Sequence, residues 1–166
     1  TDPHTVALST GETFVAKLIL VATGGKPFLP DVPGIEHAIT SNEIFHLADL
    51  PKRSLIIGGG YIACEFACIL NGLGSAVTQF YRGAQILRGF DDEVRGHVAE
   101  EMRAKGVDLH LGRDLVSMEK TADGIAVRCT DGSNKVFDTV LYATGRVPNT
   151  AGMGLEELGV ALGKGG

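Results

Sequence analysis

The sequence has 166 residues, of which 44% are hydrophobic and 21% charged, a composition that suits one compact domain or a domain with fragments of a neighbouring one. The formal net charge of −5 argues against a nucleic-acid-binding protein, which usually presents a basic surface. The sequence contains no apolar run of the roughly 18 to 20 residues that would cross a membrane. Its three cysteines are irregularly spaced and predict neither a disulfide framework nor a metal site. A chain without a disulfide framework is typical of a reducing compartment, so we expect a cytoplasmic location.

The beginning of the chain is similar to a later part of it. Residues 5–24 and 126–145 align without a gap and are identical at seven of twenty positions. Each segment predicts a strand, a glycine-containing turn, a second strand, and an apolar strand that ends in Ala-Thr-Gly. The two segments are either β-hairpins that match by chance, or the remains of a duplicated module of which the chain holds the end of the first copy and all of the second. The proline-rich stretch 26–34 is typical of a linker between them.

The second copy predicts a β-α-β-α-β unit, an antiparallel meander and a closing strand. Apolar runs at 54–57, 76–81, 107–111 and 139–143 predict buried strands, and turn signals at 123–124 and 131–132 separate the strands of the meander. Helices are expected from about 61 to 73 and from 91 to 105. We expect apolar faces made of Ile62, Phe66, Ile69 and Leu73 in the first helix, and of Val94, Val98 and Met102 in the second.

The three cysteines are expected to be buried and chemically inert. Cys64 and Cys68 lie four residues apart among apolar residues of the first predicted helix, and Cys129 alternates with apolar residues of a predicted strand. Burial of this kind raises the pKa of a thiol and removes its reactivity.

A glycine-rich motif joins the first strand of the unit to its first helix. Residues 58–63 read Gly-Gly-Gly-Tyr-Ile-Ala, the G-x-G-x-x-A variant of the dinucleotide-binding fingerprint. Gly58 would permit the tight turn, Gly60 would let the backbone approach a pyrophosphate, and Ala63 would allow the helix to pack closely on the strand. The N–H groups at the amino end of the helix would then bind the phosphates. The motif predicts a nucleotide-binding site, and it is not a P-loop because no Gly-Lys-Ser/Thr follows.

The end of the second strand indicates which nicotinamide nucleotide would bind. An NAD site usually places an acidic residue there, on the ribose 2′-hydroxyl. The sequence instead has Tyr81 followed by Arg82, with a second arginine at position 88, and contains no acidic residue between Tyr81 and Asp91. Two guanidinium groups suit a 2′-phosphate, so we expect NADPH, although a pair of solvated surface arginines is the alternative.

The stretch from 55 to 92 resembles the NADPH domain of the glutathione reductase family, and the similarity extends to Ala-Thr-Gly-Gly at 22–25, Thr-Ser at 40–41 and Gly-Arg-Val-Pro-Asn-Thr at 145–150. In this family of flavin disulfide reductases an FAD domain precedes the NADPH domain and resumes after it, and a dimerisation domain closes the chain. The resemblance implies an α/β, Rossmann-like three-layer FAD/NAD(P)-binding fold, with helices on one side of a parallel sheet and an antiparallel β-meander on the other. It also implies three parts: the end of the FAD domain and the linker at 1–38, the NADPH-binding domain at 39–146, and a truncated return into the FAD domain at 147–166.

The resemblance also implies roles for individual residues. Gly59 and Ile62 would contact the cofactor, and Gly145 would line the nicotinamide side. Tyr61 would cover the flavin until nicotinamide displaces it, and Glu65 would face the nicotinamide amide and pair with a lysine near the flavin. Without the resemblance, Tyr61 and Glu65 are an ordinary helix aromatic and an ordinary surface acid.

The implied activity belongs to a complete homodimeric enzyme, in which NADPH reduces FAD, the flavin reduces a protein disulfide, and the dithiol reduces glutathione disulfide. The family's redox cysteine pair and general-acid histidine have no counterpart in this sequence, so we expect the chain alone to be inactive. Gly83 stands where relatives often carry a third cation. The alternatives are a sibling disulfide reductase with another thiol substrate, and a non-catalytic NADPH-binding module.

Overall fold

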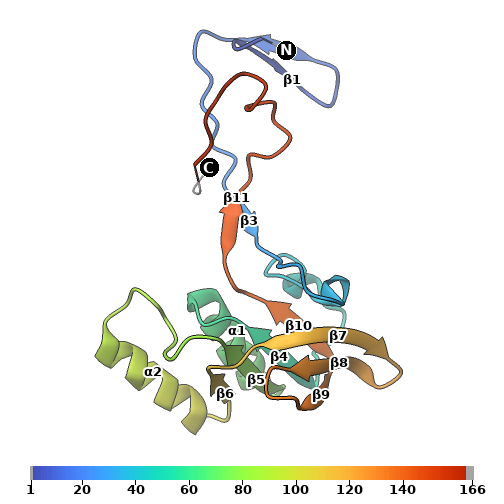
Figure 1. The fold of residues 1–166 in the computed structure, drawn as a ribbon, viewed down its shortest axis with the longest axis vertical. Helices are drawn as coiled ribbons and strands as arrows, with labels where there is room; N and C mark the ends of the chain where they lie inside the picture. Colours follow the sequence, from blue (N-terminus) through green and yellow to red (C-terminus); the bar gives the residue numbers. More distant parts are fainter. Residues whose placement is uncertain (1, 164–166) are drawn as a thin grey trace. The chain divides into compact units, whose positions relative to one another are not determined.

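The computed structural model describes residues 2–163 and divides the chain into two compact units. The first unit comprises residues 1–26 and 146–166, and the second comprises residues 27–145. The labels of Figure 1 correspond to these strands and helices: β1 (Thr5–Ala7), β2 (Thr13–Val15), β3 (Gly25–Pro27), β4 (Arg53–Ile57), α1 (Tyr61–Gly72), β5 (Ala76–Tyr81), α2 (Asp92–Ala104), β6 (Asp108–Leu111), β7 (Leu115–Thr121), β8 (Gly124–Cys129), β9 (Asn134–Phe137), β10 (Thr139–Tyr142) and β11 (Arg146–Pro148), with short 3-10 helices at Ile35–His37 and Ile44–His46.

The first unit contains less regular structure than its sequence predicts. The antiparallel hairpin of β1 and β2 forms as expected, and β3 pairs with β11. The third expected strand, which would end at 22–24, is absent, and Leu18 and Leu20 are about 90% exposed (91% and 90%). That prediction was wrong because a strand requires a hydrogen-bonded neighbour, and none of the strands in the described residues pairs with this segment.

The second unit is built on a four-stranded parallel sheet in the order β10-β4-β5-β6. Its strand bounds agree with the apolar runs of the sequence to within one residue. The carboxyl ends of β4, β5 and β10 lie at one edge of the sheet, since Ile57 pairs with Phe80 on one side and with Tyr142 on the other. This edge is where the glycine-rich loop begins.

Two apolar clusters cover the two faces of this sheet. Ile56 packs in a cluster with residues of α1 and α2, whereas its neighbours Leu55 and Ile57 pack with the antiparallel meander of β7, β8 and β9. Alternate residues of a strand point to opposite faces, so β4 separates the helices from the meander. The expected three-layer α/β fold is therefore confirmed (Figure 1).

The helices lie where the sequence predicts them, but their buried faces differ from the prediction. In α1 the buried residues are Ala63, Cys64, Phe66, Ala67 and Leu70, and in α2 they are Ala99 and Met102. Of the expected face residues, Ile69 (51%), Leu73 (63%) and Val94 (50%) are exposed. Phe66 and Met102 are buried as predicted, and small residues such as Ala63, Ala67 and Ala99 complete the buried faces, which a search for large apolar side chains overlooks.

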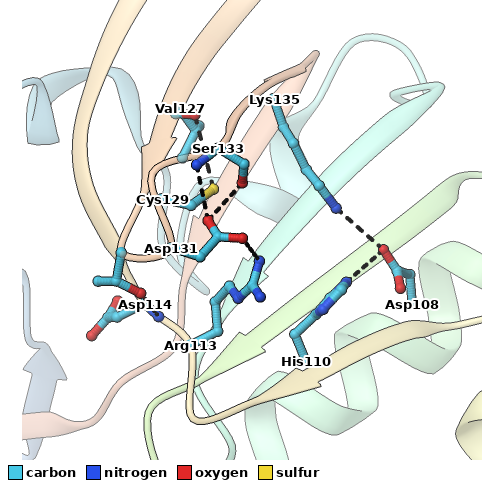
Figure 2. A network of polar contacts seen from close by, with 10 residues as sticks. Asp108, His110, Arg113, Asp114, Val127, Cys129, Asp131, Ser133 and Lys135 are labelled. Atoms are coloured by element: carbon cyan, nitrogen blue, oxygen red, sulfur yellow. Dashed lines mark hydrogen bonds and ion pairs between the residues drawn. The ribbon is translucent and has the colours of Figure 1, made fainter.

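A polar network joins the meander to the edge strand of the sheet (Figure 2). Asp108 of β6 lies 2.8 Å from Nε2 of His110 and 3.5 Å from Nζ of Lys135 in β9. Arg113, which follows β6, pairs with Asp131 in the turn between β8 and β9. Burial tends to raise the pKa of Asp108, but His110 and Lys135 outweigh it and leave that pKa below its usual value.

None of the helices formed by residues 2–163 combines the length and the apolar character that crossing a membrane requires.

Candidate nucleotide-binding site

The first glycine of the fingerprint occupies a position that no other residue could fill without strain. Gly58 has a φ of 137°, and a Cβ atom there would lie 2.3 Å from the carbonyl oxygen of Ala143, at the end of β10. Its N–H donates to the carbonyl of Phe80 at 2.9 Å, which anchors the turn on β5. Gly58 thus lets the chain leave β4 between two neighbouring strands.

The next residues leave a row of backbone donors without backbone partners. The helix begins at Tyr61 with Gly60 as its N-cap residue, and the first amide within it to find a backbone acceptor is that of Cys64, which donates to Gly60. Within residues 2–163, no backbone hydrogen bond uses the N–H groups of 59–63. A Cβ atom at Gly60 would meet no atom within 4 Å, so open space lies beside the backbone there. Free amides at a helix amino end beside open space fit the pyrophosphate of a dinucleotide.

The ring of Tyr81 packs against two glycines at this edge. A Cβ atom at Gly59 would lie 2.4 Å from Cγ of Tyr81, and one at Gly83 would lie 2.6 Å from Cε1 of the same ring. The structure therefore gives a physical reason for the glycine at position 83, where the resemblance leads one to look for a third cation. A longer side chain at 83 would have to displace the ring.

Each of the two candidate arginines directly follows a residue that contacts Gly59. Arg82 follows Tyr81, and Arg88 follows Leu87, whose N–H donates to the carbonyl of Gly59 at 2.6 Å. Leu87 has a φ of 55°, which is an unfavourable backbone conformation for a leucine, and its side chain is buried. Both arginines are exposed, and neither side chain forms a hydrogen bond or ion pair with any part of the chain that the structure describes. The loop thus holds two free cations beside the glycine-rich motif.

The residues expected near nicotinamide follow the carboxyl ends of two paired strands, β4 and β10. Tyr61 and Glu65 are exposed and lie one turn apart on α1, so they share a helix face. Gly145 follows β10, the strand that pairs with β4; it has a φ of 151°, and a Cβ atom there would meet no atom within 4 Å. Ile62 is half-buried and Ala63 is fully buried against the core. Their proposed roles toward a cofactor stay predictions.

Two of the three cysteines are buried and the third is not. Cys64 and Cys129 lie in the two apolar clusters, and burial raises the pKa of the Cys64 thiol. Cys68 is exposed, so the expectation of a buried thiol was wrong for this residue. The reason is the rotation of α1, which turns Cys68 and Ile69 away from the sheet together.

Three residues at this edge do not stand out as site residues in the sequence. In the sequence, Tyr81 draws attention only because no acidic residue stands at its position, and Leu87 is only one residue of a predicted loop. The sequence pattern gives no role to Gln79, yet its side chain is fully buried and donates from Nε2 to the carbonyl of Gly58 at 2.9 Å. The one signal for it in the sequence is an amide in the middle of the apolar strand 76–81.

Comparison with known proteins identifies relatives over the whole chain. The profile of the family described as pyridine nucleotide-disulphide oxidoreductase matches residues 1–166. Glutathione reductase of Burkholderia cepacia is 50% identical over 157 residues, which cover 95% of this chain and 35% of that protein. Trypanothione reductase of Leishmania donovani is 44% identical over 169 residues, covering 99% of this chain and 34% of the relative. The chain thus spans about a third of the length of the curated relatives it matches.

Solved structures give the same result for the fold. The HOCl-induced flavoprotein disulfide reductase RclA from Escherichia coli matches with a TM-score of 0.90 and 28% identity, over 98% of this chain and 38% of that one. An engineered water-forming NADPH oxidase bound to NADPH matches with a TM-score of 0.78 and 26% identity, over 89% of this chain and 35% of that one. Its substitutions replace an aspartate with alanine and introduce an arginine at the next position. They also introduce a second arginine six positions after the first.

Proposed function

The chain belongs to the pyridine nucleotide-disulphide oxidoreductase family, and we propose that it is the NADPH-binding part of an FAD-dependent disulfide reductase, with glutathione disulfide as the substrate of the complete protein. The observation that carries this proposal is the combination of unpartnered loop amides at 59–63 with two unpaired arginines anchored beside them. Amides suit the pyrophosphate, and arginines suit a 2′-phosphate.

In this proposal the residues of the chain bind and orient the nucleotide. The amides of Gly59 and Gly60 and the amino end of α1 would hold the pyrophosphate, with Ile62 and Ala63 packing beneath them. Gly145 would leave room for the nicotinamide beside the loop, and Tyr61 and Glu65 would hold its ring and amide in place for hydride transfer. When bound, NADPH supplies the hydride and FAD accepts it.

The choice of NADPH over NADH follows from the end of β5. Tyr81 leaves no carboxylate to accept a hydrogen bond from a ribose 2′-hydroxyl, and Arg82 and Arg88 are available for a phosphate. The NADPH oxidase described above supports this interpretation, because its two introduced arginines have the same spacing of six and its lost aspartate directly precedes the first. Tyr81 precedes Arg82 in the same way.

The rest of the reaction is assigned to parts of the polypeptide beyond this sequence. We propose that residues 1–38 and 147–166 belong to an FAD domain and that residues 39–146 form the NADPH domain. The complete protein would form a homodimer, carry the redox disulfide and the general-acid histidine, and act in the cytoplasm. Trypanothione is an alternative substrate, since a trypanothione reductase is 44% identical to this chain.

Calorimetry with NADP⁺ and NAD⁺ on the purified protein tests the nucleotide assignment. We expect NADP⁺ to bind at least a hundredfold more tightly than NAD⁺, because hydrogen bonds to charged groups contribute roughly 1.5–3 kcal/mol each and 1.4 kcal/mol corresponds to about tenfold in affinity. Equal affinities would contradict the assignment. The disulfide substrate is tested separately, by comparing NADPH oxidation by the full-length protein with glutathione disulfide and with trypanothione disulfide.

A further inference from the structure

A fully buried amide lies directly beneath the glycine-rich loop. Gln79 stands in the middle of β5 with none of its surface exposed, and donates from Nε2 to the carbonyl of Gly58 at 2.9 Å. The same nitrogen lies 3.8 Å from Sγ of Cys64. Its Oε1 atom is buried and has no hydrogen-bond partner within the described residues. A buried amide that leaves one of its polar atoms unpaired is a cost to stability, so packing of the core alone does not account for a glutamine at this position.

The amide restricts the orientation of one peptide group of the loop. In a trans peptide the C=O and the N–H point in opposite directions. The carbonyl of Gly58 is held toward the core by Gln79, so the N–H of Gly59 in the same peptide group is directed away from the core. The next carbonyl, that of Gly59, accepts a hydrogen bond from the N–H of Leu87 at 2.6 Å, so the N–H of Gly60 in that peptide group is directed away from Leu87.

The glycines make this restraint necessary. Glycine adopts positive and negative φ with similar ease, so a run of three glycines would rotate its peptide groups freely without external contacts. Flexible donors lose affinity because binding must first order them. Leu87 restrains one of the two peptide groups from the following loop, and Gln79 restrains the other from within the sheet.

We propose that Gln79 is a positioning residue for the nucleotide pyrophosphate: it fixes the Gly58 carbonyl so that the Gly59 amide is presented to the phosphates. The role rests on the proposed nucleotide site and adds a residue to it. Gln79 itself touches no ligand, and its effect is restricted to the pyrophosphate. The adenosine 2′-phosphate would be bound by Arg82 and Arg88, which do not depend on this contact.

The test replaces Gln79 in the intact protein that carries this chain. Gln79→Met keeps the length of the side chain and Gln79→Leu keeps its approximate volume, while both remove the donor and the unpaired oxygen. Calorimetry would measure affinity for NADP⁺, which contains the pyrophosphate, and for 2′-AMP, which has the 2′-phosphate without it. We expect both variants to bind NADP⁺ about tenfold more weakly and 2′-AMP within twofold of the wild type. Loss of the donor leaves the Gly58 carbonyl without this hydrogen bond, so 2′-AMP binding, and not the denaturant midpoint, is the measure that the site stays folded.

Ser54→Ala is the matched control. Ser54 is fully buried in the adjacent strand β4 and shares a 2.8 Å hydrogen bond with Ser75, away from the glycine-rich loop. It should change the denaturant midpoint and leave both affinities unchanged. Unchanged NADP⁺ affinity in the Gln79 variants, or an equal loss of affinity for NADP⁺ and 2′-AMP, would overturn the role of Gln79 but not the proposed function. A wild-type protein that binds neither ligand would contradict the proposed function as well.

Discussion

At the scale of single residues, the structure relates Tyr81 to the two arginines beside it. The Tyr81 ring packs on Gly59 and on the position of Gly83, so the loop from 82 to 88 leaves β5 alongside the glycine-rich motif. A third cation at position 83 is incompatible with this ring position. Recognition of a 2′-phosphate would therefore depend on Arg82 and Arg88 alone.

The first prediction concerns these arginines. Arg82→Ala and Arg88→Ala should each weaken binding of 2′-AMP about tenfold, since each removes one charge-assisted contact to a partly exposed phosphate. Binding of 5′-AMP, which has no 2′-phosphate, should not change. Calorimetry with the two nucleotides gives the comparison, and Arg128→Ala, an exposed arginine in the meander, is the matched control. Equal losses for both nucleotides would mean that the arginines support the fold or a general positive potential.

Glu65 provides a second prediction in the intact protein. The carboxylate is exposed, four residues after Tyr61, and would orient the nicotinamide without contacting the adenosine half. Glu65→Ala should slow flavin reduction by NADPH about tenfold, measured by stopped-flow absorbance, because small misplacements of the reacting atoms are costly. Glu100→Ala, on the exposed face of α2, serves as control. A tenfold loss of affinity for 2′-phospho-ADP-ribose would contradict this placement of Glu65.

The limits of prediction from sequence are clearest for residues whose role depends on distant neighbours. The glycines of 58–63 and the missing acid at Tyr81 are local signals, and both are readable in the sequence. Gln79 and Leu87 act through contacts with a loop 21 and 28 residues away, on Gly58 and Gly59, so periodicity gave no indication of them. The exposure of Cys68 and Ile69 depends on the rotation of α1 on the sheet, which small residues determine.

At the scale of secondary-structure elements, the parallel sheet and the meander were predictable because each apolar run has a partner strand in the same unit. Residues 18–21 align with β10 within the two similar segments, which are identical at seven of twenty positions, yet only β10 forms a strand. β10 pairs with β4, while the earlier segment has no such neighbour within the described chain. Sequence pattern thus predicts the capacity to form a strand, and pairing decides whether one forms.

The start of α2 carries the third prediction. Asp91 accepts hydrogen bonds from the N–H groups of Glu93 at 3.0 Å and Val94 at 3.2 Å, and so satisfies two amides at the helix start. Asp91→Ala should lower the free energy of unfolding by about 1 kcal/mol, as measured by urea denaturation. Asp91→Ser retains a capping oxygen and should recover most of the loss. An unchanged midpoint for Asp91→Ala would show that this cap contributes nothing to stability.

The junction of β4 and β10 gives a fourth prediction, on pH dependence. The hydrogen bond from the Arg53 side chain holds the pKa of Asp138 below its usual value, and the Arg53 backbone N–H donates to the same carboxylate at 2.8 Å. A carboxyl group with a lowered pKa in the folded state adds stability above its unfolded pKa of about 3.9, and this stability is lost as pH falls through the folded value. Asp138→Asn should therefore be less stable than the wild type at pH 7.

The difference between the two proteins should shrink below about pH 4, where the wild-type carboxylate becomes protonated and loses the same interaction. Urea midpoints at several pH values between 7 and 2 would follow this convergence. Asp49→Asn, at an exposed position whose side chain forms no ion pair within residues 2–163, is the control for loss of a surface charge. A difference that stays constant down to pH 2 would mean that the charge of Asp138 contributes nothing to stability.

At the scale of the whole molecule, the second unit contains complete layers and the first does not. The sheet of unit 2 is covered on both faces by apolar clusters, whereas Phe14, Val15, Leu18 and Leu20 of unit 1 are more than half exposed. Unit 1 also lacks any helix among its described residues. The residues that we propose for nucleotide binding all belong to unit 2, so nucleotide binding and flavin chemistry are expected to be separable.

The last prediction tests this separation with the 166-residue chain itself. Its glycine-rich fingerprint at 58–63 is assigned to NADPH. The redox cysteines of the family are separated by four residues, whereas only three residues lie between Cys64 and Cys68. We expect the purified chain to be colourless, to bind NADP⁺, and to show no NADPH oxidation with glutathione disulfide. Absorbance between 350 and 500 nm, calorimetry and a coupled thiol assay would measure these three properties. A flavin spectrum at one equivalent per chain would mean that the fingerprint binds FAD. Turnover with glutathione disulfide would place a redox centre among Cys64, Cys68 and Cys129, to which we assign no catalytic role.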